Sequence, residues 1–234
     1  MPIVGLEPKN LSTLVKHEYA GVRGYCRKMV SFTNAANTDL AFGTVLGKRL
    51  VGGAAAAVAG ASNVGDGAMG AITVADGTAP GNYVLTVTSE SSDAGGFEVS
   101  GPNGALVGTG NVDAAFSGGG LSFTLADGAE DFDTGDTFVI TVTGTYEYDV
   151  LTNTASDGTA VPAGIYIGKI NGTFGVDYEN ITANTATNVI ALVQGPAVVG
   201  KAELVLDASV ISDAEKQAVY DGLEALGIVV ADQL

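Results

Sequence analysis

Two side chains that support covalent and acid–base chemistry occur once each in this sequence, His17 and Cys26. A catalytic nucleophile needs a base within hydrogen-bond reach, and that base needs a third group to orient it. Both residues lie in an amino-terminal stretch of about thirty residues that shows neither a helical nor a strand period, so no pocket is implied around them. A zinc site would need about four Cys, His or acidic ligands at characteristic spacing, and these are absent. We therefore expect structural or incidental roles for both residues.

The segment 127–136 holds the best metal candidates in the chain, the carboxylates of Asp131, Asp133 and Asp136. A Ca²⁺ ion takes about six to eight oxygen ligands. Asp131 and Asp133 fit the spacing of an EF-hand loop, but the third ligand and the distal Glu of that loop are missing. Asp and Gly are also the residues that a hairpin turn selects. The pattern favours a turn between two strands, and we expect no metal and no other cofactor.

The remaining motifs do not indicate an enzyme. Glycines recur at 101–104 and 108–110, but the Gly-Lys-Ser/Thr of a phosphate-binding loop does not follow them. Phe and Tyr residues between 83 and 138 mostly occupy alternating strand positions, which favours core packing over the stacking of a sugar. The many acids leave open one alternative, a hydrolase that acts on sugars with two placed carboxylates. We expect a protein without catalytic activity.

Charge is distributed unevenly along the chain, whose formal net charge is −16. Residues 1–49 carry a net charge of +4 and the rest carries −20, and no Lys or Arg occurs between Leu50 and Gly168. An acidic body repels nucleic acid, so no direct nucleic-acid partner is expected. No apolar stretch is long enough to span a bilayer and no export signal is recognisable, which predicts a soluble protein without a membrane partner.

The elements that must position these residues are mostly short strands. A low-complexity segment, 51–70, reads as a linker. A helix is expected near the carboxyl terminus, because Ser212 and Glu215 form a capping box and Gly227 stands where a helix would end. The strands are expected where apolar residues alternate or cluster between turn signals, at 29–32, 83–88, 97–100, 121–125, 138–143, 165–167, 189–193 and 228–230, and 40–47 is expected to form a turn followed by a strand. The fold class is therefore mainly β with one carboxyl-terminal helix (α+β).

Five short motifs, in this order along the chain, carry a resemblance to a known family. They are 25–30 (YCRKMV), 41–47 (AFGTVLG), 157–165 (DGTAVPAGI), 193–199 (VQGPAVV) and 223–230 (LEALGIVV). Together they resemble the lambda-type head decoration proteins of phages, which stabilise capsids without being enzymes. The resemblance implies a trimer on the outer surface of the expanded head, made in the host cytoplasm and bound to the major capsid protein.

The resemblance also implies a division of the chain. An amino-terminal arm, 1–28, would bind the capsid by adding a strand to it. A β-tulip-like decoration core would comprise 29–51 and 145–234. The segment 52–144 departs from simpler family members and is predicted to be an inserted, outward-facing β-sandwich of immunoglobulin-like type. The alternative from another class is a surface adhesin or fibre module that binds host-surface glycans.

Particular residues follow from this assignment. The capsid-binding arm would act through Lys9, Leu11, Leu14, Val15, Lys16, His17, Tyr19 and Arg23. The contacts within the trimer or the core would include Pro162, Ile165, Pro196, Leu223 and Leu226.

Overall fold

The computed structural model describes residues 11–19, 25–90, 94–169 and 178–232. It divides into two compact units. Unit 1 comprises Met1–Arg49 and Tyr146–Leu234, and unit 2 comprises Leu50–Thr145. The predicted insert, 52–144, lies within unit 2.

One sheet of unit 2 contains five strands in the order β4-β12-β7-β8-β9. The strands are β4 (Val45–Ala59, of which 50–59 belong to unit 2), β12 (Thr137–Val150, with 137–145 in unit 2), β7 (Gly81–Ser89), β8 (Gly96–Ser100) and β9 (Leu106–Asn111). Side chains alternate between the faces of a strand. Accordingly Tyr83, Leu85 and Val87 of β7 are buried, while Val84 is 37 % exposed. The alternation predicted from the sequence for this region is confirmed.

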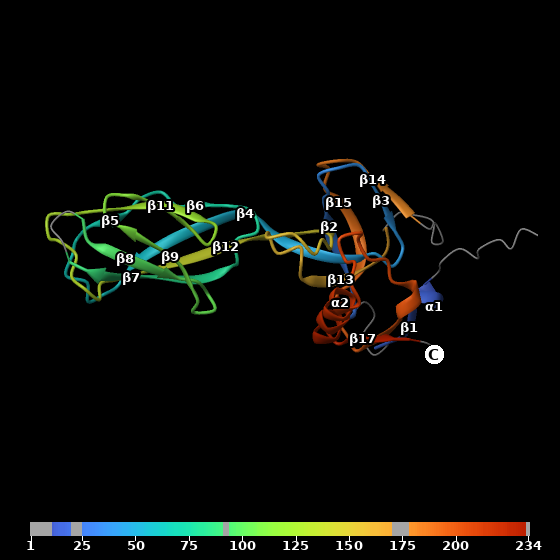
Figure 1. The fold of residues 1–234 in the computed structure, drawn as a ribbon. Coiled ribbons are helices and arrows are strands. Elements are labelled where there is room, and N and C mark those ends of the chain that lie inside the picture. The colour runs from blue at the N-terminus through green and yellow to red at the C-terminus, as the bar shows by residue number, and fades with distance from the viewer. Residues whose placement is uncertain (1–10, 20–24, 91–93, 170–177, 233–234) are drawn as a thin grey trace, which may run out of the picture. The chain divides into compact units, whose positions relative to one another are not determined.

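The second sheet of unit 2 is built around one strand, β11 (Leu121–Ala126). β11 pairs with β10 (Ala115–Gly118) along one edge and with the two-residue strands β5 (Ala68–Met69) and β6 (Thr73–Val74) along the other. Figure 1 shows the two layers, with β5, β6 and β11 in one and β7, β8, β9 and β12 in the other. Unit 2 is therefore a β-sandwich.

The core of unit 2 lies between the two sheets and is rich in aromatic rings. Phe97 of β8 meets Phe116 of β10 and Phe123 of β11, with ring centroids 5.8 and 6.1 Å apart. The centroids of Phe116 and Phe123 are 4.8 Å apart. Aromatic pairs at such separations add favourable energy beyond their buried area. The prediction that these rings form a core is confirmed.

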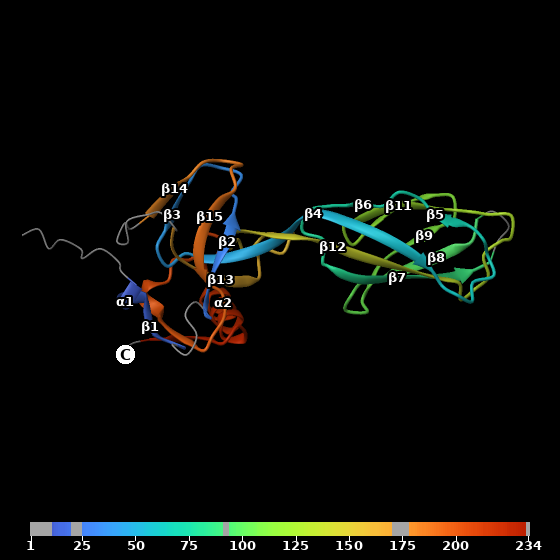
Figure 2. The same ribbon diagram turned by 180° about the vertical axis from the view of Figure 1, so that it is seen from behind.

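Unit 1 contains a sheet that curls back on itself. Its strands are β2 (Arg27–Phe32), β15 (Thr187–Leu192), β13 (Pro162–Lys169), and the parts of β4 and β12 at 45–49 and 146–150. β2 also pairs with β12, with Phe32 opposite Tyr148, so the strand order closes into a ring. Figure 2 shows β2 beside β15.

Smaller elements complete unit 1. β3 (Thr38–Ala41) pairs with β14 (Tyr178–Ile181). A second sheet has the order β1-β16-β17, and the remaining elements are helical. Their bounds are β1 (Val15–Glu18), β16 (Ala197–Gly200), β17 (Ile228–Ala231), α1 (Leu11–Leu14), η1 (Lys201–Glu203) and α2 (Asp213–Ala225).

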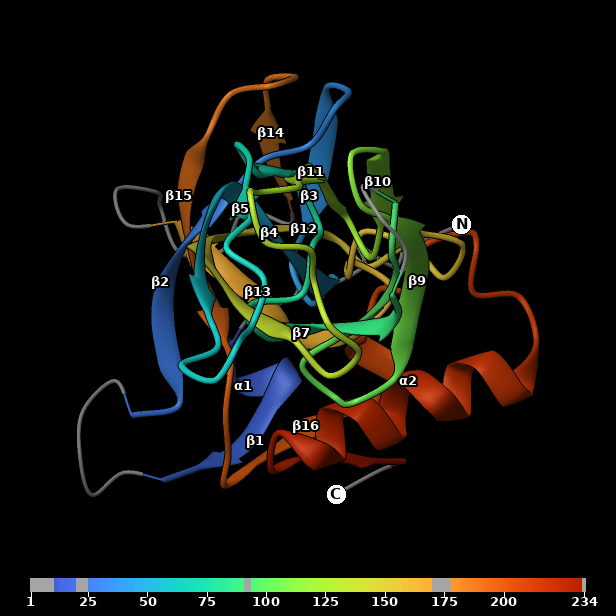
Figure 3. The ribbon, with the colours of Figure 1, turned by 90° about the vertical axis from the view of Figure 1, so that its left-hand side faces the viewer.

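The carboxyl-terminal helix α2, visible along its length in Figure 3, begins and ends where the sequence predicts. The Ser212 hydroxyl accepts the backbone N–H of Glu215, and the Glu215 carboxylate accepts the backbone N–H of Ser212. Gly227 adopts φ +79° directly after the helix, a conformation that costs Gly little. These local signals are confirmed, as is the mainly β fold class with a carboxyl-terminal helix.

One prediction about elements is wrong. The linker expected at 51–70 is occupied up to Ala59 by β4, because β12 lies beside it and provides hydrogen-bond partners that override the weak strand preference of Ala and Gly. In the described part of the predicted arm, 1–28, β1 pairs with β16 and Leu14 is fully buried, so this part packs on unit 1. The turn expected within 127–136 is present, with the Asp136 N–H donating to the Asp133 carbonyl at 3.0 Å, but the strands on either side, β11 and β12, belong to different sheets.

Candidate functional site

Four residues predicted to bind a capsid line one cleft in unit 1. Leu11, Val15, Lys16 and His17 surround a space of about 440 Å³ together with Glu18 and Arg27. The Arg27 Nε donates a hydrogen bond of 2.8 Å to the Glu18 carboxylate. Glu18 and Arg27 at this cleft thus satisfy each other.

The other predicted arm residues lie elsewhere. Leu14 belongs to the core of unit 1. The ring of Tyr19 meets that of Tyr25 edge to face at 5.6 Å, and its backbone N–H donates to the carbonyl of Pro196 at 3.0 Å. Lys9 and Arg23 lie outside the described residues.

His17 and Cys26 have separate surroundings. The imidazole of His17 is exposed on β1, where the residue pairs with Val198. The Cys26 thiol is buried and donates to the carbonyl oxygen of Pro196 at 3.6 Å. A buried thiol with a backbone partner behaves as a small apolar side chain.

The residues predicted as trimer or core contacts differ in burial. Ile165 and Leu223 are fully buried in the core of unit 1, and Leu226 packs against that core. Pro162 is half-buried and close to Gly222, where an added Cβ would lie 2.8 Å from the Pro162 ring. Pro196 is exposed.

The acidic segment 127–136 contains one buried carboxylate, Asp136, which is 4 % exposed. Its oxygens accept the backbone N–H groups of Val64, Gly65 and Asp133 at 3.0, 2.9 and 3.1 Å. Asp131 and Asp133 are exposed. In the described parts of the chain, no three His, Cys, Asp or Glu side chains gather as a metal site would require. Asp136 therefore ties two loops together.

A charged cluster that the sequence did not reveal surrounds Arg49 in unit 1. Its guanidinium lies 3.3 Å from Asp149 and 3.5 Å from Asp157. Burial raises the pKa of Asp149 and outweighs the hydrogen bonds and the charge of Arg49. For Asp157, burial acts upward, but the hydrogen bonds from Thr159 and the charge of Arg49 together lower the pKa. The cluster neutralises a half-buried cation.

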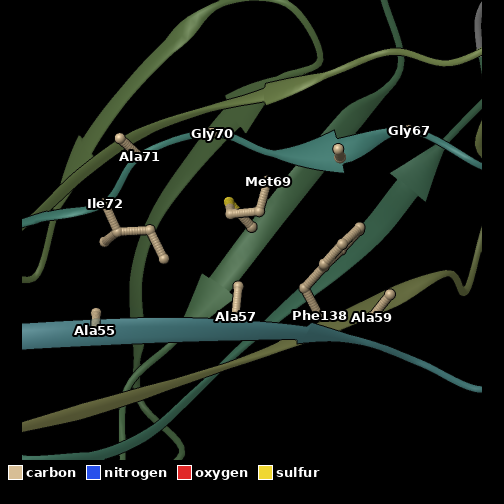
Figure 4. Close-up of a pocket in the computed structure, with 10 residues that line it drawn as sticks. Ala55, Ala57, Ala59, Gly67, Met69, Gly70, Ala71, Ile72 and Phe138 are labelled. Atoms are coloured by element: carbon tan, nitrogen blue, oxygen red, sulfur yellow. The ribbon is translucent and has the colours of Figure 1, made fainter.

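The second space is a groove of about 380 Å³ in unit 2 (Figure 4). Ala55, Ala57 and Ala59 of β4 line one side, the segment 67–72 lines the other, and Phe138 of β12 contributes its ring. Figure 4 shows the Ala side chains pointing from β4 toward the segment that carries Met69 and Ile72. Every lining residue is Ala, Gly, Met, Ile or Phe, so the polar groups that line this groove belong to the backbone. We call it the β4 groove.

Two strand edges without partners face each other across the β4 groove. β13 pairs with β4 only up to Gly47, and beyond that point β12 is the one strand that neighbours β4 among the described residues. On the opposite side, β5 and β6 pair only with β11 within the described chain. Exposed edges are normally protected by charge, Pro or bulges. Neither 50–59 nor 67–75 contains a charged residue or a Pro.

The β4 groove has defined ends. At one end Gly53 packs against the side chain of Val74, and the Gly77 N–H donates to the Leu50 carbonyl at 2.9 Å. At the other end β4 stops at Ala59. The unpaired edge of β4 thus spans about nine residues, or about 30 Å of extended chain.

Comparisons with known proteins assign no family to this chain. No family model matches the sequence, and no curated protein matches it. A crystal structure of FlgL from Xanthomonas campestris matches with a TM-score of 0.31 and 21 % identity, covering 44 % of this chain and 33 % of that one. A second crystal form of the same protein matches with a TM-score of 0.31 and 23 % identity, covering 43 % of this chain and 32 % of that one. The flagellar junction protein FlgL from Legionella pneumophila matches with a TM-score of 0.32 and 17 % identity, covering 44 % of this chain and 37 % of that one. The matches span about a third of those proteins' own length.

These findings overturn the resemblance to head decoration proteins. The matched structures are flagellar junction proteins, and neither a family model nor a curated relative supports a capsid assignment. The predicted capsid cement function, the trimer on the capsid, the major capsid protein as partner and the location on a virion are therefore wrong, and the glycan-binding adhesin gains no support. The similarity to FlgL is itself too weak to assign a function. Among the described helices, none is both long and apolar enough to cross a membrane.

Proposed function

We propose that the chain is a non-catalytic binding protein that receives an extended segment of a partner protein along the β4 groove. The observation that carries the proposal is the pair of unpaired strand edges, β4 on one side and β5 with β6 on the other, that face each other across this groove.

Strand addition makes use of what an open edge offers. An extended segment beside β4 would gain main-chain hydrogen bonds and place alternate side chains in the groove. Each such hydrogen bond contributes a net of about 0.5–1.5 kcal/mol. A long edge without charge or Pro is the kind of edge that pairs with another chain.

The lining favours a peptide over a small molecule. Small-molecule sites combine an apolar cavity with a few polar side chains that fix the ligand's orientation. The β4 groove has apolar side chains and glycines only. The same lining supports a function without catalysis, because none of its side chains can act as an acid, a base or a nucleophile.

The cleft in unit 1 is a weaker candidate for strand addition. Its edge strand, β1, carries Lys16, His17 and Glu18 in succession. Charged side chains on an edge discourage pairing with another strand.

A matched pair of variants tests the proposal in the full chain. Ala57→Leu fills the groove, whereas Ala56→Leu adds the same side chain on the exposed opposite face of β4. The probe is a bead-bound library of extended peptides of about nine residues, the length of the free edge. We expect selected peptides to slow hydrogen exchange in 50–59, and Ala57→Leu to weaken their binding at least about tenfold while Ala56→Leu does not.

Two results would overturn the proposal. One is a library from which no peptide protects 50–59 from exchange. The other is binding that Ala57→Leu leaves unchanged while circular dichroism shows that the variant is folded.

A further inference from the structure

We infer that the segment bound in the β4 groove is basic, with Lys or Arg residues on both sides of a short run in which alternate side chains are apolar. The inference rests on the proposed function and adds the chemistry of the partner.

Unit 2 is acidic throughout. Between Leu50 and Thr145 the sequence contains eleven Asp and Glu residues and no Lys or Arg. The negative potential of such a surface attracts cationic segments and repels anionic ones. Within unit 2 no cationic side chain competes with a partner for these carboxylates.

Carboxylates stand at both ends of the groove. Asp66 directly precedes the lining residue Gly67, and its oxygen accepts the Glu130 backbone N–H at 3.0 Å, which places Glu130 beside it. Both acidic side chains are exposed. At the other end the exposed Asp76 directly precedes Gly77, which is bonded to Leu50 of β4. A strand along β4 would therefore bring its two flanks near acidic groups.

The middle of the groove selects apolar side chains. Ala55, Ala57 and Ala59 lie two residues apart, which is the period at which the side chains of an added strand would face the groove. Met69, Ile72 and Phe138 provide apolar surface around the space that the small Ala side chains leave. Burial there favours aliphatic residues at alternate positions.

An open edge could also pair with a second copy of this chain, and charge affects that association. Pairing β4 with β4 of another molecule would bring two units together that each carry eleven acids and no base. Like charges oppose such an association. The basic partner segment is therefore favoured over self-association.

The test uses two synthetic peptides with the same alternating Val-Thr centre, one flanked by Lys and Arg and the other by Glu and Asp. Affinity for the full chain is measured by fluorescence anisotropy at about 0.1 M and about 1 M salt. We expect binding of the basic peptide only, weakened roughly tenfold at the higher salt, where the screening length falls from about 10 Å to about 3 Å. Asp76→Asn should weaken binding several-fold, whereas Glu98→Gln, the same charge change on β8, should not.

The outcomes separate this inference from the proposed function. If both peptides bind equally at both salt concentrations and Ala57→Leu weakens both, the groove binds peptides but the basic partner is wrong. If neither peptide binds and the library also yields none, both proposals are wrong. If sedimentation shows self-association that protects 50–59 from hydrogen exchange, the occupant is a second copy and the inference is overturned.

Discussion

The β-sandwich of unit 2 has two seams where its sheets meet, and they differ. At the closed seam β9 leads directly into β10 through residues 112–114, and the backbones touch: a Cβ added at Gly118 would lie 2.8 Å from the Val107 carbonyl oxygen. At the open seam β4 faces β5 and β6 across a groove of about 380 Å³.

Both seams are rich in small residues, so composition does not explain the difference. At the closed seam small residues admit aromatic rings, because Cβ atoms at Gly110 and Gly118 would lie 2.6 Å from the Phe97 ring and 2.8 Å from the Phe116 ring. At the open seam Ala55, Ala57 and the ring of Phe138 line a space that they leave open. What differs is the connection: a three-residue turn holds β9 to β10, whereas the longer segment 60–67 connects β4 to β5 and is held by Asp136.

The largest expected effect comes from emptying the closed seam. Phe116→Ala removes a ring that is 3 % exposed and packs on Phe97 and Phe123, so we expect a loss of about 3–5 kcal/mol in the stability of unit 2. Met69→Ala at the open seam should cost about 1 kcal/mol, because Met69 is only partly buried. Hydrogen exchange of unit 2 amides under urea measures both, and equal losses would contradict the contrast between the seams.

The next effect concerns the loops at the end of the open seam. Asp136→Asn replaces a buried carboxylate that accepts three backbone N–H groups with an amide that has one acceptor oxygen. We expect a loss of about 2–3 kcal/mol and faster exchange of the Val64 and Gly65 amides. The control is Asp133→Asn, an exposed carboxylate three residues away, which should change stability by less than about 0.5 kcal/mol. Slow exchange at both amides in the Asp136 variant would show that this carboxylate does not hold the loop.

A smaller effect compares glycines at the two seams. At the closed seam, Gly118→Ala would crowd both backbone and ring, with an expected cost of about 1–2 kcal/mol. At the open seam, the Cβ of Gly70→Ala would lie 3.1 Å from the Thr124 carbonyl oxygen, a contact that a small shift relieves. The melting temperature of Gly118→Ala, measured by thermal denaturation, should therefore lie below that of Gly70→Ala. The reverse order would mean that the sheets are less tightly joined at the seam between β9 and β10.

How far these features could be read from the sequence depends on whether their signal is local. The capping box of Ser212 and Glu215 involves neighbours along the chain, and it was predicted in full. The alternating strand at Tyr83 was equally readable, because burial on one face of a sheet imposes a period of two. The run 54–57, four Ala residues, has no such period, and it forms a strand only because β12 lies beside it.

The β4 groove was missed for a related reason. An open edge is defined by the absence of a neighbouring strand, and no residue type marks an absence. The one available signal was the lack of charge and Pro across 50–59, which the linker interpretation overlooked. Likewise, the turn-forming residues around Asp133 do not indicate whether the two strands that flank them belong to the same sheet.

The smallest effect depends on pH. It compares Asp157, whose carboxylate lies beside Arg49, with Asp76 at the open seam, which has no Lys or Arg in its own unit. Asp157 has a lowered pKa in the folded protein, so its contribution to stability is complete above the unfolded value of about 3.9 and is lost as the pH falls through its folded pKa. We expect Asp157→Asn to destabilise unit 1 near pH 7 and to match the wild type once the pH lies well below about 4. Asp76→Asn, the same change beside the β4 groove, should leave the stability of unit 2 near its wild-type value at pH 7. Urea denaturation at several pH values measures both differences. A difference for Asp157→Asn that persists in acid would assign its effect to the neutral hydrogen bonds with Thr159 rather than to the charge of Arg49.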